Sequence, residues 1–309
     1  KRQELKRLIK FITDNFNGSE TVVMPAEIAK YLDDVKAVLD KYNNGQVSDF
    51  EYWDEVATIR ENYRESVKLY LSGEETEVSK DYINEVFSAF AAKIEMGNGL
   101  VPTYFTHEAV DFEPVVDENG NPVMSHYGLQ KAVVKEFKTV ALPYFLEGPA
   151  RMMGNVNEET AREMYNNVKK TGLYDEKLAM YKTSASIEGC SMEAGRCRAF
   201  TPGWQERENV FLHMEYKYIL SMIRAGICPE FYDTITRALI PFLDPNMYGR
   251  STLENSSFIA SSVNPNPDIH GRGFVARLSG STTEMLSIWI EMFMGGKVFI
   301  YEDGKLVLN

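Results

Sequence analysis

The stretch Glu254–Met294, ENSSFIASSVNPNPDIHGRGFVARLSGSTTEMLSIWIEMFM, passes from a polar loop into an apolar helix. Ser281 followed by Glu284 has the spacing of a capping box, so we place the start of this helix at or near Ser281. The amides just before it then point away from the helix, and together with the positive end of the helix dipole they favour an anion. The alternative is an ordinary capped helix after a long loop, and these residues leave both interpretations open.

Three more side chains in the same loop suit an anion. His270, Arg272 and Arg277 all lie in the loop that precedes the expected helix start, four to eleven residues before Ser281. Guanidinium groups match phosphate and carboxylate better than any other side chain does. The stretch therefore predicts a pocket for phosphate or for a sugar acid, if the loop is more than a connection.

Composition points to a globular protein and narrows its partners. The chain has 309 residues, 44% of them hydrophobic, which is enough for a large core. Its net charge of −12, with no cluster of Lys and Arg, argues against nucleic acid as a partner. We find neither the apolar run that a membrane span requires nor the core of a signal peptide, and we expect a cytoplasmic protein with no membrane partner.

The cysteines agree with that compartment. Cys190, Cys197 and Cys228 are an odd number and too few to staple such a long chain, so we expect reduced thiols. Cys190 and Cys197 with His213 suggest zinc only weakly, because no CxxC pair or fourth ligand is evident. We predict no metal and no organic cofactor.

Hydrophobic periodicity predicts a mainly α fold. We expect helices at residues 1–17, 25–42, 50–71, 79–94, 129–140, 157–170, 174–181, 206–225, 230–242 and 281–294, and hairpins at residues 101–123 and 297–308. The hairpins are expected to turn at Asp117–Gly120 and at Asp303–Gly304. Successive pairs of long helices are what an α/α toroid produces. We therefore expect one partial toroidal domain over residues 1–295, with a β-hairpin insertion at about 101–125 and a β segment beginning at 296–309.

Residues 202–213, PGWQERENVFLH, form the densest polar cluster outside the first stretch. Acidic groups here suit a helix N-terminus, which is the plain structural explanation. Trp204 beside Gln205 and Glu206 also suits a sugar, because pyranose faces stack on indole while amides and carboxylates bind hydroxyls. On its own, His213 is more often a satisfied histidine of the core than a ligand, and the functional interpretation is the alternative.

Two windows resemble the inverting glycoside phosphorylases of glycoside hydrolase family ninety-four, which includes cellobiose and chitobiose phosphorylases. Phe200–His213 is similar to the family segment Tyr-Pro-Pro-Gly-x-Lys-Glu-Asn-Gly-Gly-x-Phe-x-His and keeps Pro202, Gly203, Glu206, Phe211 and His213. In the second window, Glu254, Gly271–Gly273 and Leu278–Ser281 occupy the places of Glu-Pro-Tyr, Gly-Arg-Gly and Tyr-Thr-Gly-Ser. The phrases around them look most like the large 1,2-β-oligoglucan phosphorylases.

The resemblance implies the C-terminal part of an (α/α)₆ catalytic domain. There, inorganic phosphate attacks the anomeric carbon of a β-linked gluco-oligosaccharide with inversion and releases a sugar 1-phosphate. Carried over by position, His213, Ser279 and Gly280 hold the phosphate. We expect the sugar near five residues, namely Trp204, Gln205, Glu206, Glu254 and Arg272.

The general acid of this family is an aspartate in a Trp-Asn-Asp motif, which the chain lacks. The chain begins without Met and already in a helical pattern, so we expect it to be a piece of a longer glycosyltransferase. The acid is then expected before Lys1, and this piece is expected to be inactive. The family's acceptor-facing Tyr and Lys are Phe200 and Gln205 here, which disfavours cellobiose itself.

Other functions remain compatible with these residues. A toroidal glycoside hydrolase or transglycosylase would activate water or a sugar hydroxyl in place of phosphate. A noncatalytic carbohydrate-binding or assembly module would use the same helices without chemistry. The linkage, the chain length of the substrate and a homodimer of the full-length protein are left open.

Overall fold

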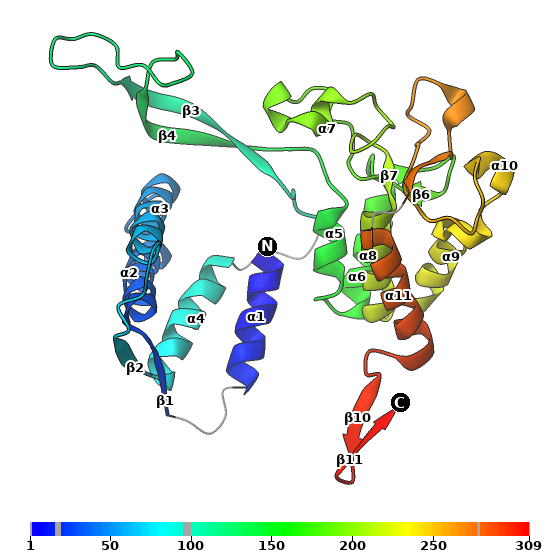
Figure 1. Ribbon diagram of the computed structural model, residues 1–309, viewed down its shortest axis with the longest axis horizontal. Coiled ribbons are helices and arrows are strands. Elements are labelled where there is room, and N and C mark those ends of the chain that lie inside the picture. The colour runs from blue at the N-terminus through cyan, green and yellow to red at the C-terminus, as the bar shows by residue number, and fades with distance from the viewer. Residues whose placement is uncertain (1, 16–19, 95–99, 277–278, 309) are drawn as a thin grey trace. The chain divides into compact units, whose positions relative to one another are not determined.

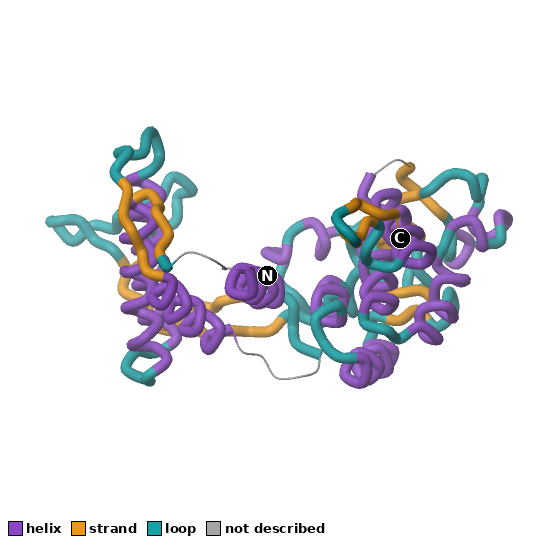
Figure 2. The backbone as a smooth tube through the Cα atoms, turned by 90° about the horizontal axis from the view of Figure 1, so that it is seen from below, coloured by secondary structure: helices purple, strands orange, loops and turns teal. Residues whose placement is uncertain are grey.

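The computed structural model describes residues 2–15, 20–94, 100–276 and 279–308. Helices dominate it, and each sheet formed by the described strands has two or three strands (Figures 1 and 2). The predicted mainly α class is therefore confirmed. The chain divides into two compact units, residues 1–97 with 107–139 and residues 98–106 with 140–309. This division falls inside the single domain expected over residues 1–295, and the toroid stays a prediction.

The first unit consists of four helices, a short two-stranded sheet and the outer part of a long hairpin. Its elements are α1 (Arg2–Asn15), β1 (Thr21–Pro25), α2 (Ala26–Asn43), α3 (Asp49–Ser66), β2 (Glu75–Ser79) and α4 (Lys80–Ile94). The four predicted helices are present, and the Ser79 hydroxyl caps α4 by accepting from the Tyr82 amide at 3.2 Å. Strands β1 and β2 pair antiparallel and were not predicted, because five residues are too few to show a clear alternation.

Two predictions about this unit were wrong. Helix α3 ends at Ser66, five residues before the predicted end, and Leu69, Tyr70 and Leu71 are exposed. Residues 129–140 were expected to be weakly helical, but from residue 132 on they belong to strand β4 (Ala132–Ala141), which pairs with β3 (Phe105–Pro114). The hairpin therefore extends beyond the bounds of about 101–125 expected for it. The β-branched residues of β4 favour a strand. The turn at Asp117–Gly120 is where it was expected, with the Gly120 amide donating to the Asp117 carbonyl at 3.0 Å.

The second unit packs helices around one large core. Helix α8 (Leu212–Arg224) lies between α5 (Glu147–Met153) and α11 (Ser279–Met294) and also contacts α9 (Cys228–Ala238), as Figure 1 shows. The remaining elements are α6 (Glu158–Lys169), β5 (Tyr174–Asp175), β6 (Met180–Tyr181), α7 (Arg196–Ala199), β7 (Val210–Phe211), α10 (Pro245–Tyr248), β8 (Ser256–Ile259), β9 (Gly273–Ala276), β10 (Phe299–Glu302), β11 (Lys305–Leu308) and 3₁₀ turns at 192–194, 240–242 and 267–269. The C-terminal hairpin β10–β11 confirms the predicted turn, with Asp303 and Gly304 both at positive φ.

Three predictions about this unit need correction. Residues 174–181 are the paired strands β5 and β6 rather than a short helix. The long helix begins at Leu212 rather than at Glu206, because Gly203, Gln205 and Glu208 all have φ values between 51° and 72°, which no right-handed helix permits. The loop 203–208 also packs tightly, since a Cβ at Gly203 would lie 2.6 Å from the Asn264 amide nitrogen. The helix predicted at 230–242 ends at Ala238 and continues as a 3₁₀ turn.

Candidate anion and sugar site

The imidazole of His213 packs directly against Gly280. His213 is the second residue of α8, and Gly280 is the second residue of α11, so the first turns of the two helices meet here. A Cβ added at Gly280 would lie 2.5 Å from Nδ1 and 2.7 Å from Cγ of the imidazole. Only glycine allows this approach. The structure thus brings together two of the three residues expected to hold phosphate; the side chain of the third, Ser279, lies outside the described residues.

Two further charged side chains complete this cluster. Glu284 Oε1, from the second turn of α11, lies 3.5 Å from His213 Nε2 and 3.7 Å from Lys217 Nζ. Lys217 lies four residues after His213 on α8, which places both on one face of the helix. Their side chains keep 29% of their surface exposed, against 16% for Glu284. The site therefore combines an imidazole, an ammonium group and the start of a helix with one carboxylate.

The charge of His213 depends on these neighbours. Burial lowers the pKa of its imidazole below the ordinary value, and the ammonium group of Lys217 lowers it further. The carboxylate of Glu284 opposes both effects but does not cancel them. The imidazole is consequently neutral at pH 7 in the absence of a ligand. An anion bound beside it would favour the charged form and raise this pKa.

The predicted capping role of Ser281 was wrong. Helix α11 begins at Ser279, so Ser281 lies in its first turn, where it is 1% exposed and accepts a hydrogen bond from Asn255 Nδ2 at 3.0 Å. Glu284 faces His213 and Lys217 instead of closing a capping box. The amides in the first turn of α11 still lack intrahelical acceptors, as expected of any helix start. This turn begins at Ser279, two residues before the expected start.

A row of aromatic rings runs from Trp204 to His213. In the sheet β7–β8–β9, Phe211 pairs with Phe258, and Phe258 pairs with Phe274. Their rings stack at 4.8 Å and 5.4 Å between centroids, because paired residues on neighbouring strands point to the same face. Trp204 stacks on Phe274 at 3.7 Å, and Phe211 meets His213 edge to face at 5.6 Å. The sheet thereby holds the His213 ring in place through its edge-to-face contact with Phe211.

Two of the residues predicted to bind sugar, Trp204 and Glu206, are already engaged with protein neighbours. One indole face of Trp204 is covered by Phe274, which leaves only the other face for a pyranose. Gln205 lies at positive φ in the tight loop and is partly exposed. Glu206 does not begin a helix as expected; it forms a bidentate pair with Arg196 at 2.7 Å and 2.8 Å.

Two of the other predicted ligands, Glu254 and Arg272, make side-chain contacts within their own loops. Glu254 is exposed and pairs with Arg250 at 3.0 Å, although its neighbour Asn255 reaches the first turn of α11. Arg272 donates from Nε to the Asp268 carbonyl at 2.9 Å. His270 bridges Lys177 and the Asn264 carbonyl, both at 2.8 Å, and so supports the loop. Arg277 lies outside the described residues.

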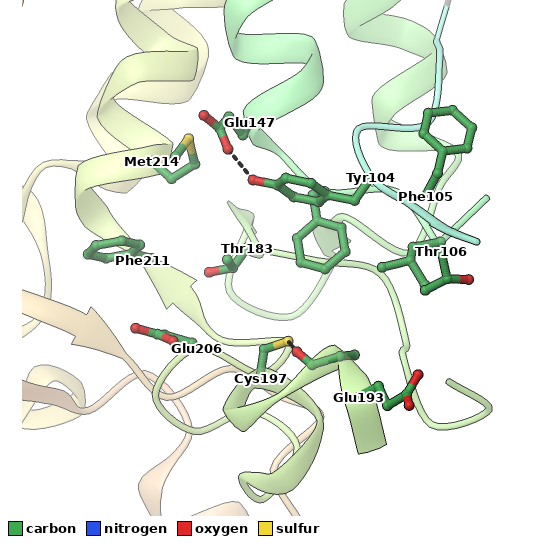
Figure 3. A pocket seen from close by; sticks show the side chains of 13 residues that line it. Tyr104, Phe105, Thr106, Glu147, Thr183, Glu193, Cys197, Glu206, Phe211 and Met214 are labelled. Carbon is green, nitrogen blue, oxygen red and sulfur yellow. Dashed lines mark hydrogen bonds between the residues drawn. The ribbon is translucent and has the colours of Figure 1, made fainter. Parts of the chain in front are cut away.

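A pocket of about 480 Å³ opens beside the cluster, entirely within the second unit (Figure 3). Its wall includes seven side chains used below, namely Tyr104, Glu147, Glu193, Cys197, Glu206, Phe211 and Met214. In Figure 3 the Tyr104 hydroxyl and the Glu147 carboxylate point toward one another, joined by their hydrogen bond. Phe211 is shared between this pocket and His213, so the two sites are neighbours.

Sequence reasoning missed several residues of the site. Lys217 had a signal, because the spacing of four residues from His213 on a helix predicts a common face. Glu284 was noticed but given a capping role. Tyr104 and Glu147 had no local signal, since nothing in their surrounding sequence shows that they meet across 43 positions.

No protein-family model matches the chain, and no curated protein matches it. Over residues 2–15, 20–94, 100–276 and 279–308, no helix combines the length and apolarity needed to cross a bilayer. Within that same part of the chain no three His, Cys, Asp or Glu side chains gather in a way that could hold a metal ion, and the three cysteines carry free thiols.

Proposed function

We propose that the chain is part of a cytoplasmic inverting glycoside phosphorylase, with inorganic phosphate bound where His213 meets the first turn of α11. The observation that carries the proposal is the contact between the imidazole and Gly280. It joins the two sequence windows that resemble the phosphorylases, although 67 positions separate these residues. Ser279, which begins α11, and Gly280 would present backbone amides to the anion.

Electrostatics support an oxyanion at this point. The ammonium group of Lys217 and the positive end of the α11 dipole both favour negative charge. Glu284 balances them in the free protein through its contacts with Lys217 and His213. A phosphate would compete with this carboxylate for the same two partners and would bind best once the imidazole is protonated.

The proposed reaction needs few protein groups. A phosphate oxygen forms a bond to the anomeric carbon while the bond to the glycosidic oxygen breaks, and that oxygen takes a proton from a general acid. Because the nucleophile is already an anion, no carboxylate base is required. We place the β-gluco-oligosaccharide near Glu206, Trp204 and Glu254, and we assign the general acid to none of the described residues.

A titration of the imidazole with inorganic phosphate tests the binding step. We expect phosphate to raise the pKa of His213, observed by NMR of the imidazole protons, because the bound anion stabilises the charged form. The His213→Ala variant identifies the resonance and should weaken phosphate binding by about tenfold or more. His126, which is exposed in the segment between β3 and β4, provides the control and should not respond. A His213 signal indifferent to phosphate would contradict the proposal.

The reaction itself is tested on the natural protein with all the residues that its gene encodes. We expect β-linked gluco-oligosaccharides to yield a sugar 1-phosphate only when phosphate is added. Release of free sugar at the same rate without phosphate would instead identify a hydrolase. That second candidate is favoured by one observation, the two carboxylates Glu147 and Glu206 in one pocket, since hydrolases act through a carboxyl pair.

A further inference from the structure

The pocket beside His213 differs in charge from the cluster that it adjoins. Three of its wall residues are glutamates, Glu147, Glu193 and Glu206, and none of the residues described as lining it is basic. The guanidinium groups of Arg151 and Arg196 are engaged in pairs with two of these glutamates, Glu147 and Glu206. A ligand entering this pocket therefore meets carboxylate oxygens and aromatic rings rather than cations.

Glu147 is held in a fixed orientation at the wall of this pocket. Its Oε2 accepts a hydrogen bond from the Tyr104 hydroxyl, and its Oε1 accepts one from Arg151 Nε at 2.9 Å. Burial alone would raise the pKa of this carboxyl, but these hydrogen bonds and the nearby charges of Arg151 and Lys217 lower it below the ordinary value. Glu147 is thus an anion at neutral pH, able only to accept hydrogen bonds.

Phe211 and Met214 give another part of the pocket wall an apolar surface (Figure 3). An aromatic ring next to fixed carboxylates suits a ligand with an apolar face and a rim of hydroxyl donors. A pyranose has both. The volume of about 480 Å³ lies in the range of ordinary small-molecule sites.

We propose that this pocket binds a neutral pyranosyl unit, with Glu147 accepting hydrogen bonds from its hydroxyls and Phe211 covering its apolar face. The same carboxylates exclude phosphate and sugar acids, which leaves the anion to the His213 cluster. Tyr104 and Arg151 act as positioning residues for Glu147. The choice of a sugar rests on the proposed function, whereas the preference for a neutral ligand over an anion rests on the pocket alone.

The reactivity of Cys197 can show whether the pocket holds a ligand, because this residue lies in the pocket wall. Cys228, which is exposed on α9, serves as the control. The experiment measures alkylation of both cysteines by iodoacetamide in the whole chain, by peptide mass spectrometry. We expect methyl β-D-glucopyranoside at millimolar concentration to slow the labelling of Cys197 at least threefold and to leave Cys228 unchanged. D-glucuronate at equal concentration should protect neither.

Two variants test the role of Glu147. Glu147→Gln should raise the glycoside concentration needed for protection by about tenfold, because a hydrogen bond to a charged acceptor becomes one to a neutral amide. Tyr104→Phe keeps the ring and should raise it by about threefold, since it loosens the carboxylate. The matched control is Glu158→Gln, which breaks a similar i,i+4 pair with Arg162 on α6 and should change nothing.

The outcomes separate this inference from the proposed function. Protection that is absent in the unaltered chain, equally strong with glucuronate, or unchanged in both pocket variants overturns the sugar pocket, whatever His213 does with phosphate. If the glycoside protects through Glu147 while His213 ignores phosphate, the pocket stands and phosphorolysis fails. Thermal melting of each variant shows whether a lost response reflects the pocket or unfolding.

Discussion

Helix α8 carries ionisable side chains on two faces whose surroundings differ. His213 and Lys217 face Glu284 on α11, and each keeps 29% of its side chain exposed. Glu215 points into the core and is fully buried, with the Tyr181 amide donating to its Oε1 at 2.8 Å. The first face keeps charges in contact with solvent, where a ligand can reach them. On the second face burial disfavours the charged form of Glu215, and the hydrogen bond from the Tyr181 amide offsets this only in part.

The contrast separates a group suited to binding from a group that affects stability. Burial, opposed by the Tyr181 hydrogen bond and reinforced by the charge of Asp175, raises the pKa of Glu215 to about 8. Burial also lowers the pKa of His213, but Glu284 and any arriving anion shift it back. Partial exposure is what allows a ligand to change the protonation of one group and not of the other.

The largest expected effect concerns Glu215. Between pH 4.5 and pH 8 the folded state binds more protons than the unfolded state at this carboxyl, so the free energy of unfolding should fall as pH rises. The shift corresponds to a loss on the order of 4 kcal/mol across that window. Glu215→Gln should remove this part of the pH dependence, measured by urea denaturation at several pH values.

The control for that measurement is Glu284→Gln, which alters the exposed face and should keep the dependence on pH. Lys182 is buried too, and burial lowers its pKa, so the difference between the unaltered chain and Glu215→Gln is the informative quantity. Parallel curves for those two proteins would show that Glu215 ionises freely within the fold.

The same contrast explains what could be predicted from the sequence. Helices with a clear apolar stripe, such as α2 and α6, were predicted to within one or two residues of their bounds, because burial of one face follows periodicity. The start of α8 was missed because left-handed residues at Gln205 and Glu208 carry no signature; neither is glycine or asparagine.

The candidate site was predicted only in part, because local sequence rules do not show which residues of separate helices meet. The contact between His213 and Gly280 was expected only through the resemblance, since no local rule pairs residues on separate helices. Glu284 was assigned to a cap because the rule considers spacing, whereas the structure turns its carboxylate toward Lys217. Tyr104 and Glu147 depend on tertiary packing alone.

A smaller effect is expected from closing the contact at α11. Gly280→Ala would place a methyl group 2.5 Å from His213 Nδ1, so the imidazole must move away from the first turn of the helix. We expect phosphate affinity to fall by about tenfold, measured by calorimetric titration, with a modest loss of stability. Gly189→Ala is the matched control, because nothing lies within 4 Å of its added Cβ. Equal phosphate affinity in both variants would remove the anion site from this position.

The smallest expected effect tests whether the carboxylate of Glu284 competes with phosphate for His213 and Lys217. Glu284→Gln removes the carboxylate that raises the pKa of His213, so this pKa should fall further in the free protein. Phosphate should nevertheless bind a few times more tightly, because it no longer competes with a carboxylate for Lys217. Glu291→Gln is the control, since Glu291 lies two turns later on α11, is 15% exposed like Glu284, and pairs with Arg224 instead. Weaker phosphate binding in Glu284→Gln would mean that the carboxylate orients the imidazole for the anion rather than competing with it.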